Sequence, residues 1–168
     1  MKVLYLLSVW LHILAAVTWL GGMLFLVLVV VPVTRGPQYR EVAGELFHWL
    51  GVRFRWVGWI CFGLLIATGT VNLIYRGVTW ASLVDARFWN GPFGHTLGMK
   101  LFLVAIILAA SAYHDFYIGP QATAAWQAAS ASPRALRLRL QARWMGRINL
   151  LLALLVVALA VILVRGWI

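Results

Sequence analysis

Three ionisable side chains with nitrogen atoms interrupt apolar stretches of this sequence, and their chemistry is the first clue to function. His12 lies in the first apolar stretch, and Lys100 and His114 lie in the third. An ionisable side chain is costly in hydrocarbon, so one that is kept there is a functional-site hypothesis by default. We therefore take His12, Lys100 and His114 as the leading candidate ligands.

Helical spacing predicts that the first two candidates share one depth in the membrane. His12 follows Lys2 by ten residues, which is about 15 Å of helical rise. Lys100 follows the Asn90-Gly91 turn by nearly the same number of residues, and from the same side of the membrane. The side chains of His12 and Lys100 can therefore approach each other.

His114 is predicted to lie deeper along the third helix. It follows Lys100 by fourteen residues, nearly four helical turns. The two residues then share a helix face and are separated by about 21 Å along the axis. This spacing places His114 near the opposite membrane face, where His48 is also expected.

Nitrogen ligands at two depths suit b-type haem, because axial imidazole is a common way of holding haem iron. We expect one or two haems. An outer site would use His12 and Lys100, with His95 as a weaker candidate at the start of the third apolar stretch. An inner site would use His114 and His48.

Haem also needs partners for its propionates and a slot for its macrocycle. Arg53 and Arg55 could bind the propionate carboxylates, although the positive-inside bias also places arginines there. Small residues could open a slot or simply allow close helix packing. The glycines concerned are Gly21, Gly22, Gly58, Gly63 and Gly69.

Copper is the alternative metal. His95 and Met99, with Met23, could supply imidazole and thioether ligands to copper. The sequence has no dense run of Met-x-Met or Cys-x-x-Cys type, and we interpret the single Cys61 as a helix-packing residue.

The elements that must position these residues are membrane helices. Apolar residues make up 64% of the chain and charged residues 11%, with a mean hydropathy of +0.92, whereas soluble domains are about 45–50% apolar. About 20 apolar residues cross the hydrocarbon as a helix. We predict an all-α integral membrane protein, a four-helix bundle forming one transmembrane domain over 1–168. Its spans are 3–33, 56–75, 96–118 and 148–164, the third closed by Gly119 and Pro120.

Short interfacial helices are expected in the connections between spans. Gln38 to Leu50 carries Arg40, Glu41 and Glu45 among apolar residues, which is typical of a helix lying in the interface. Gly77 to His95 is rich in aromatic residues and is expected to fold back onto the membrane surface. Ser132-Pro133 opens a basic helix that leads into the fourth span.

Orientation follows from the Lys and Arg residues of the connections. The first and third connections hold nine of them, and four lie on the opposite side of the membrane. The positive-inside rule then places both chain ends outside the cytoplasm. We expect the protein to lie in the cell inner membrane. Because the basic residues flank apolar runs, we expect the lipid bilayer and its anionic headgroups as partners and no nucleic acid.

Several segments resemble known membrane proteins. Leu11 to Leu26, Arg53 to Tyr75 and Ser111 to Pro120 resemble the copper-resistance D family. Leu97 to Val104, LGMKLFLV, with Tyr113-His114, also resembles the related HemJ-type protoporphyrinogen oxidases. The specific part of the likeness is the set His12, Trp19, Lys100 and His114.

The two resemblances imply different chemistry. The HemJ type implies that His12 and Lys100 are a haem-associated pair, and the copper-resistance D type implies copper uptake or handling. We expect a membrane-bound b-type haem protein that passes electrons, oxidising a quinol or porphyrinogen, with a redox partner. The alternatives are a copper-handling protein and an accessory subunit of a respiratory complex, and the chain could also form a homo-oligomer.

Overall fold

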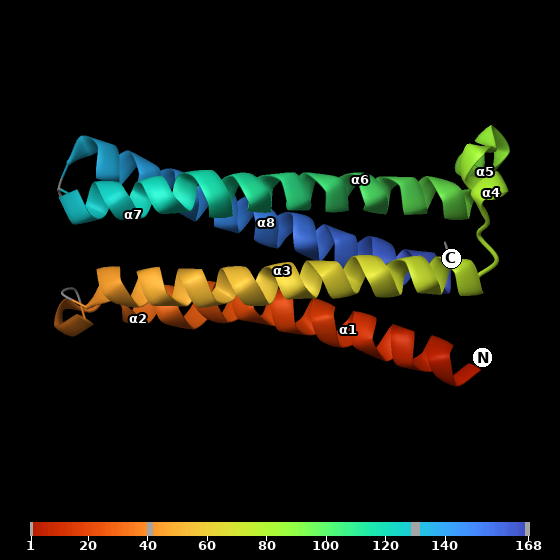
Figure 1. The fold of residues 1–168 in the computed structure, drawn as a ribbon, viewed down its shortest axis with the longest axis horizontal. Helices are drawn as coiled ribbons and strands as arrows, with labels where there is room; N and C mark the ends of the chain where they lie inside the picture. Colours follow the sequence, from red (N-terminus) through yellow and green to blue (C-terminus); the bar gives the residue numbers. More distant parts are fainter. Residues whose placement is uncertain (1, 40–41, 129–131, 167–168) are drawn as a thin grey trace. The chain divides into compact units, whose positions relative to one another are not determined.

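The computed structural model describes residues 2–39, 42–128 and 132–166, which form helices and no strand (Figure 1). In lipid every backbone polar group must be paired internally, and a helix does this within one segment. Four helices are long and apolar enough to cross a membrane: Lys2–Val33, Ala43–Tyr75, Pro92–Ala128 and Pro133–Arg165. The predicted all-α, four-span membrane class is confirmed.

The chain divides into two compact units, residues 1–79 and 80–168. Unit 1 contains α1 (Lys2–Phe25), the π-helix η1 (Leu26–Val30), α2 (Val31–Val33), the 3₁₀ turn η2 (Pro37–Tyr39) and α3 (Ala43–Tyr75). Unit 2 contains α4 (Trp80–Val84), α5 (Ala86–Asn90), α6 (Pro92–Tyr113), the π-helix η3 (His114–Ile118), α7 (Gly119–Ala128) and α8 (Pro133–Arg165).

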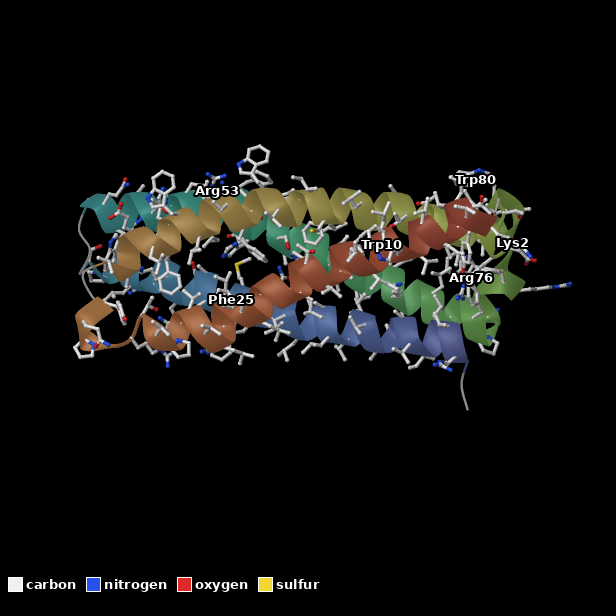
Figure 2. All side chains as sticks on the ribbon, turned by 90° about the horizontal axis from the view of Figure 1, so that it is seen from below. Lys2, Trp10, Phe25, Arg53, Arg76 and Trp80 are labelled. Carbon is white, nitrogen blue, oxygen red and sulfur yellow. The ribbon has the colours of Figure 1, made fainter. Side chains whose placement is uncertain are left out.

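Unit 1 is an antiparallel helical hairpin of α1 and α3. The rings of Tyr5 and Tyr75 pack 5.4 Å apart at one end, and Trp19 packs edge-on against Phe62 at 4.8 Å further along. Figure 2 shows the same direction reversal, with Lys2 and Arg76 at one end of the hairpin and Phe25 and Arg53 toward the other. This packing aligns one face of α1 with one face of α3.

Unit 2 pairs α6 with α8, and its first segment folds onto the start of α6. Asp85 caps α5 by accepting from the Arg87 backbone N–H at 2.9 Å. The Phe88 ring contacts Phe93, and the Gly94 backbone lies so close to Phe88 that a Cβ there would clash with the Phe88 carbonyl. The short helices predicted between the second and third spans are therefore present as α4 and α5.

The prediction that Gly119 and Pro120 stop the third helix is wrong, because the helix continues to Ala128. Proline lacks an N–H, and its ring crowds the carbonyl four residues earlier. In η3 the Gly119 N–H reaches back five residues to the His114 carbonyl, and this wider turn accommodates the proline. Pro32 follows η1 in the same way.

The predicted interfacial helix from Gln38 to Leu50 is also wrong. The described part of that segment holds only the 3₁₀ turn η2 before α3 begins at Ala43 and runs without a break to Tyr75. Glu45 lies in the first turn of α3, where a carboxylate favours the helix dipole. Arg40 and Glu41 lie outside the described residues. The helix start at Ser132-Pro133 is confirmed, since the Ser132 hydroxyl accepts from the Ala135 N–H.

Candidate functional site

His12 lies on the face of α1 that packs against α3, and its Nδ1 atom is 2.8 Å from Thr68 Oγ1. The Thr68 hydroxyl donates its only hydrogen to the Leu64 carbonyl. Thr68 Oγ1 is therefore the acceptor, and His12 Nδ1 carries the proton. In a neutral imidazole the other nitrogen, Nε2, then carries the lone pair that a metal ion needs.

Two further contacts hold this pair in place. Ser8, one turn before His12, donates its hydroxyl hydrogen to the Thr68 carbonyl at 3.2 Å. Gly69 faces the imidazole, and a Cβ there would lie 3.4 Å from His12 Cε1. The ring orientation is thus set by residues of both helices of unit 1.

His114, the first residue of η3, is held in the same way inside unit 2. Its Nδ1 lies 2.9 Å from Asp115 Oδ1, with 34% of the His114 side chain exposed. The carboxylate accepts from Nδ1–H, which again directs the lone pair to Nε2. A carboxylate behind an imidazole orients the ring and fixes its tautomer, and π-helical segments are frequent at functional sites.

A buried polar pair lies one turn before His114. Asn149 Nδ2 donates to Ser111 Oγ at 2.9 Å, joining α8 to α6. Asn149 is 8% exposed, and its Oδ1 has no hydrogen-bond partner in the described part of the chain. Sequence reasoning missed this pair, although Asn149 is the one polar residue in the apolar stretch 148–164.

The remaining predicted ligands lie on α3 and α6. His48 is exposed on α3 with its ring against Trp49, and His95 is exposed in the first turns of α6. Lys100 is half-buried in α6, in unit 2, whereas His12 belongs to unit 1. The approach of His12 and Lys100 stays a prediction.

The residues predicted to hold haem give a mixed result. Arg53 is exposed, but Arg55 is half-buried, and its Nε is buried without a hydrogen-bond partner among the described residues. At three of the candidate glycines, a side chain of unit 1 occupies the space next to the glycine backbone. These side chains take up the space that a macrocycle would need between α1 and α3. Phe54 lies against Gly22, Trp19 against Gly58 and His12 against Gly69.

Sulfur ligands are buried in unit 1. Met23 is 8% exposed and Cys61 is 4% exposed, whereas Met99 of unit 2 is 45% exposed. The described ranges contain no group of three or more His, Cys, Asp or Glu residues that could hold a metal ion. The buried sulfur atoms of Met23 and Cys61 therefore lie on the same helix pair as His12.

Comparison with known proteins identifies the segment that is shared with a family. The family model for copper resistance protein D matches residues 50–163. An uncharacterized protein of Aquifex aeolicus (strain VF5) is 32% identical over 169 residues, which covers 99% of this chain and 98% of that protein. No solved structure matches the chain. The matched family segment includes Thr68, Lys100 and His114 and begins after His12.

Proposed function

The chain belongs to the copper resistance protein D family, and from this premise we propose that it is a multi-pass membrane protein that handles copper ions. His12 and His114 bind the ion through Nε2. The observation that carries the proposal is the hydrogen bond from His12 Nδ1 to Thr68, because it leaves the metal-binding lone pair on Nε2. Imidazole nitrogen is a suitable copper ligand.

Unit 1 also offers ligands for the reduced ion. Thioether and thiolate sulfur select copper(I), and Met23 and Cys61 are both buried in the α1 and α3 pair. Copper is the cargo in this proposal. His12 lies about ten residues into α1 and His114 at the far end of α6, so a copper ion would meet imidazole at two depths.

Metal analysis of the purified protein tests this proposal. The detergent-solubilised protein is loaded with copper, washed and analysed for copper and iron per chain. We expect bound copper that falls in His12→Ala and His114→Ala. His48→Ala and His95→Ala are matched controls, because both imidazoles are exposed. Equal copper in all four variants would contradict the assignment.

Haem b is a second candidate, and one observation favours it. The Nε of Arg55, which has no hydrogen-bond partner among the described residues, is a buried cationic donor that a propionate carboxylate would satisfy. The likeness of Leu97 to Val104 to HemJ-type oxidases supports it as well. In this reading the protein passes electrons to or from a quinol or another redox partner, with His12, Lys100, His114 and His48 as the candidate axial ligands.

An absorption spectrum separates the two candidates. Protein expressed with adequate haem supply shows a Soret band and a reduced α band if haem is bound. We expect neither band to exceed trace amounts if copper is the cargo. An Arg55→Gln variant would lower haem content if Arg55 binds a propionate, whereas Arg53→Gln, at an exposed position, serves as its control.

We also propose that the protein lies in the cell inner membrane with both termini outside the cytoplasm. The excess of arginine in the first and third connections supports this orientation. Fusions of a periplasm-active phosphatase and of a cytoplasm-fluorescent protein to each end test it. Phosphatase activity at both ends is expected, and fluorescence at either end would reverse the assignment.

A further inference from the structure

The two long helices of unit 2 are longer than the hydrocarbon core of a membrane is thick. The helix from Pro92 to Ala128 has 37 residues and α8 has 33, which correspond to about 55 Å and 50 Å. The hydrocarbon core is only about 30 Å thick. One end of this helix pair must therefore project beyond the membrane.

Aromatic residues mark where the membrane ends on the side of α7. The hydrogen bond between Ser111 and Asn149 sets the two helices in register. Just past it lie the exposed rings of Tyr113 and Tyr117, stacked 5.1 Å apart, and the exposed Trp144 on α8. Aromatic belts of this kind lie at the headgroup level, so α7 and the first turns of α8 lie outside the hydrocarbon.

The projecting part, α7 with residues 132–141, is a folded hairpin tip. Figure 1 shows α7 beside the first half of α8. The Arg139 guanidinium lies 3.5 Å above the Trp126 ring and joins the two helices. A cation over an aromatic face is attracted by the ring quadrupole. The tip is therefore a defined surface outside the bilayer.

This hairpin tip carries positive charge with no acid to balance it. No Asp or Glu follows Asp115 in the sequence, whereas five arginines lie in the first half of α8 at positions 134, 137, 139, 143 and 147. Arg139 lies over Trp126, and Arg147 lies over Trp144 at 5.2 Å. Arg134 and Arg137 are exposed three residues apart, on one helix face.

Arg134 and Arg137 border a hollow of about 540 Å³. Its other lining residues are Ser132, Pro133, Leu138 and Gln141. The hollow combines guanidinium and amide donors with apolar carbon from Pro133 and Leu138. This mixture suits a peptide segment that presents carboxylates beside its aliphatic side-chain carbons.

Lipid headgroups are out of reach of these two arginines. Arg134 precedes Ile148, the start of the apolar stretch, by fourteen residues, or about 21 Å along the helix. The headgroup region extends only about 5–8 Å beyond the hydrocarbon. Arg143 and Arg147 lie at that level, and Arg134 and Arg137 lie past it.

We propose that the hairpin tip docks an acidic segment of a soluble protein through Arg134 and Arg137. The orientation proposed above, which the arginine count supports, puts this side in the cytoplasm, so the partner is a cytoplasmic protein. Arg143 and Arg147 serve the membrane surface instead. Charge complementarity of this kind speeds the encounter and selects the partner. The docking surface does not depend on the identity of the bound metal.

Peptide binding to the protein in nanodiscs tests this proposal. The discs contain only zwitterionic lipid, and the probe is a fluorescein-labelled oligoglutamate peptide followed by fluorescence anisotropy. We expect binding that weakens with added salt. Arg134→Gln with Arg137→Gln should weaken it at least about tenfold, which corresponds to the loss of one charged hydrogen bond. Arg143→Gln with Arg147→Gln removes the same charge and should change it less than about twofold.

Three results would overturn the proposal. Equal weakening by the two double variants would show attraction to net charge alone. Loss of peptide binding in discs made with phosphatidylglycerol would assign the surface to anionic lipid. Tighter binding of a short RNA, with the same dependence on Arg134 and Arg137, would assign it to nucleic acid. Circular dichroism of both double variants checks that the helices are retained.

Discussion

His12 Nδ1 lies 2.8 Å from Thr68 Oγ1, and the Thr68 hydroxyl passes its own hydrogen to the Leu64 carbonyl. This relationship decides which imidazole nitrogen is protonated. It makes Thr68 a positioning residue for His12, much as a carboxylate orients a metal-bound imidazole. Each unit of the chain has one such histidine, His12 with Thr68 and His114 with Asp115.

Thr68→Val keeps the shape of the side chain but removes the acceptor for His12 Nδ1–H. We expect copper affinity at His12 to fall by about 10- to 100-fold, the usual effect of losing an outer-shell partner. Copper titration of the purified protein measures this change. Thr70→Val is the matched control, because the exposed Thr70 hydroxyl donates only to the Ile66 carbonyl. Thr68→Ser should restore most of the affinity.

Asp115→Ala removes the acceptor for His114 Nδ1–H. The imidazole then loses its fixed tautomer, and we expect copper binding at His114 to weaken by about 10- to 100-fold. Nitrogen NMR of the labelled histidines should show a mixture of tautomers for His114 and no change for His12. Asp85→Ala removes a carboxylate that only caps α5. An equal loss of copper in that variant would contradict this assignment.

Ser111→Ala leaves the buried Asn149 amide without its partner. We expect a loss of about 1–3 kcal/mol in the free energy of unfolding. Replacing both residues, Ser111→Ala with Asn149→Leu, removes the unsatisfied polar atoms and should recover most of that loss. Unfolding in mixed detergent micelles measures both variants. A double variant less stable than the single one would mean that the pair has another role.

Gly94→Ala places a Cβ against the Phe88 carbonyl, and only a shift of α5 can relieve the clash. Gly98→Ala meets the Trp89 ring at 3.5 Å, which is an ordinary contact. We expect Gly94→Ala to destabilise unit 2 by at least about 2 kcal/mol. Gly98→Ala should be neutral or slightly stabilising, since alanine favours a helix over glycine by up to about 1 kcal/mol. Detergent unfolding of the two variants makes the comparison.

The predicted approach of His12 and Lys100 can be tested by cross-linking. In a Cys61→Ser background, His12→Cys with Lys100→Cys should be joined by a short bifunctional maleimide in membranes. His12→Cys with His114→Cys should not, because the sequence places His114 about 21 Å further along its helix. Cross-linking of the second pair alone would reject the equal depth of His12 and Lys100.

The membrane class was readable from the sequence, because long apolar runs in lipid have no stable form except the helix. The same reasoning led to the prediction that His12 and His114 are ligands, since ionisable residues stand out against apolar neighbours. It failed at Pro120, because a proline stops an α-helix locally, whereas the wider π-turn of η3 carries the chain past it. It also failed at 38–50, because residues 43–50 form the first turns of the long helix α3 and not a separate interfacial helix.

Only the tertiary structure decided the partner of His12 and the buried pair of Ser111 and Asn149. Thr68 is 56 residues from His12, and Asn149 is 38 residues from Ser111. No local pattern predicts such a pair, because it depends on the register of two packed helices. The same register places side chains of the facing helix against Gly22, Gly58 and Gly69. Composition therefore determined that this chain is a four-span membrane protein with imidazoles inside it, and helix packing determined which nitrogen of His12 can meet a metal ion.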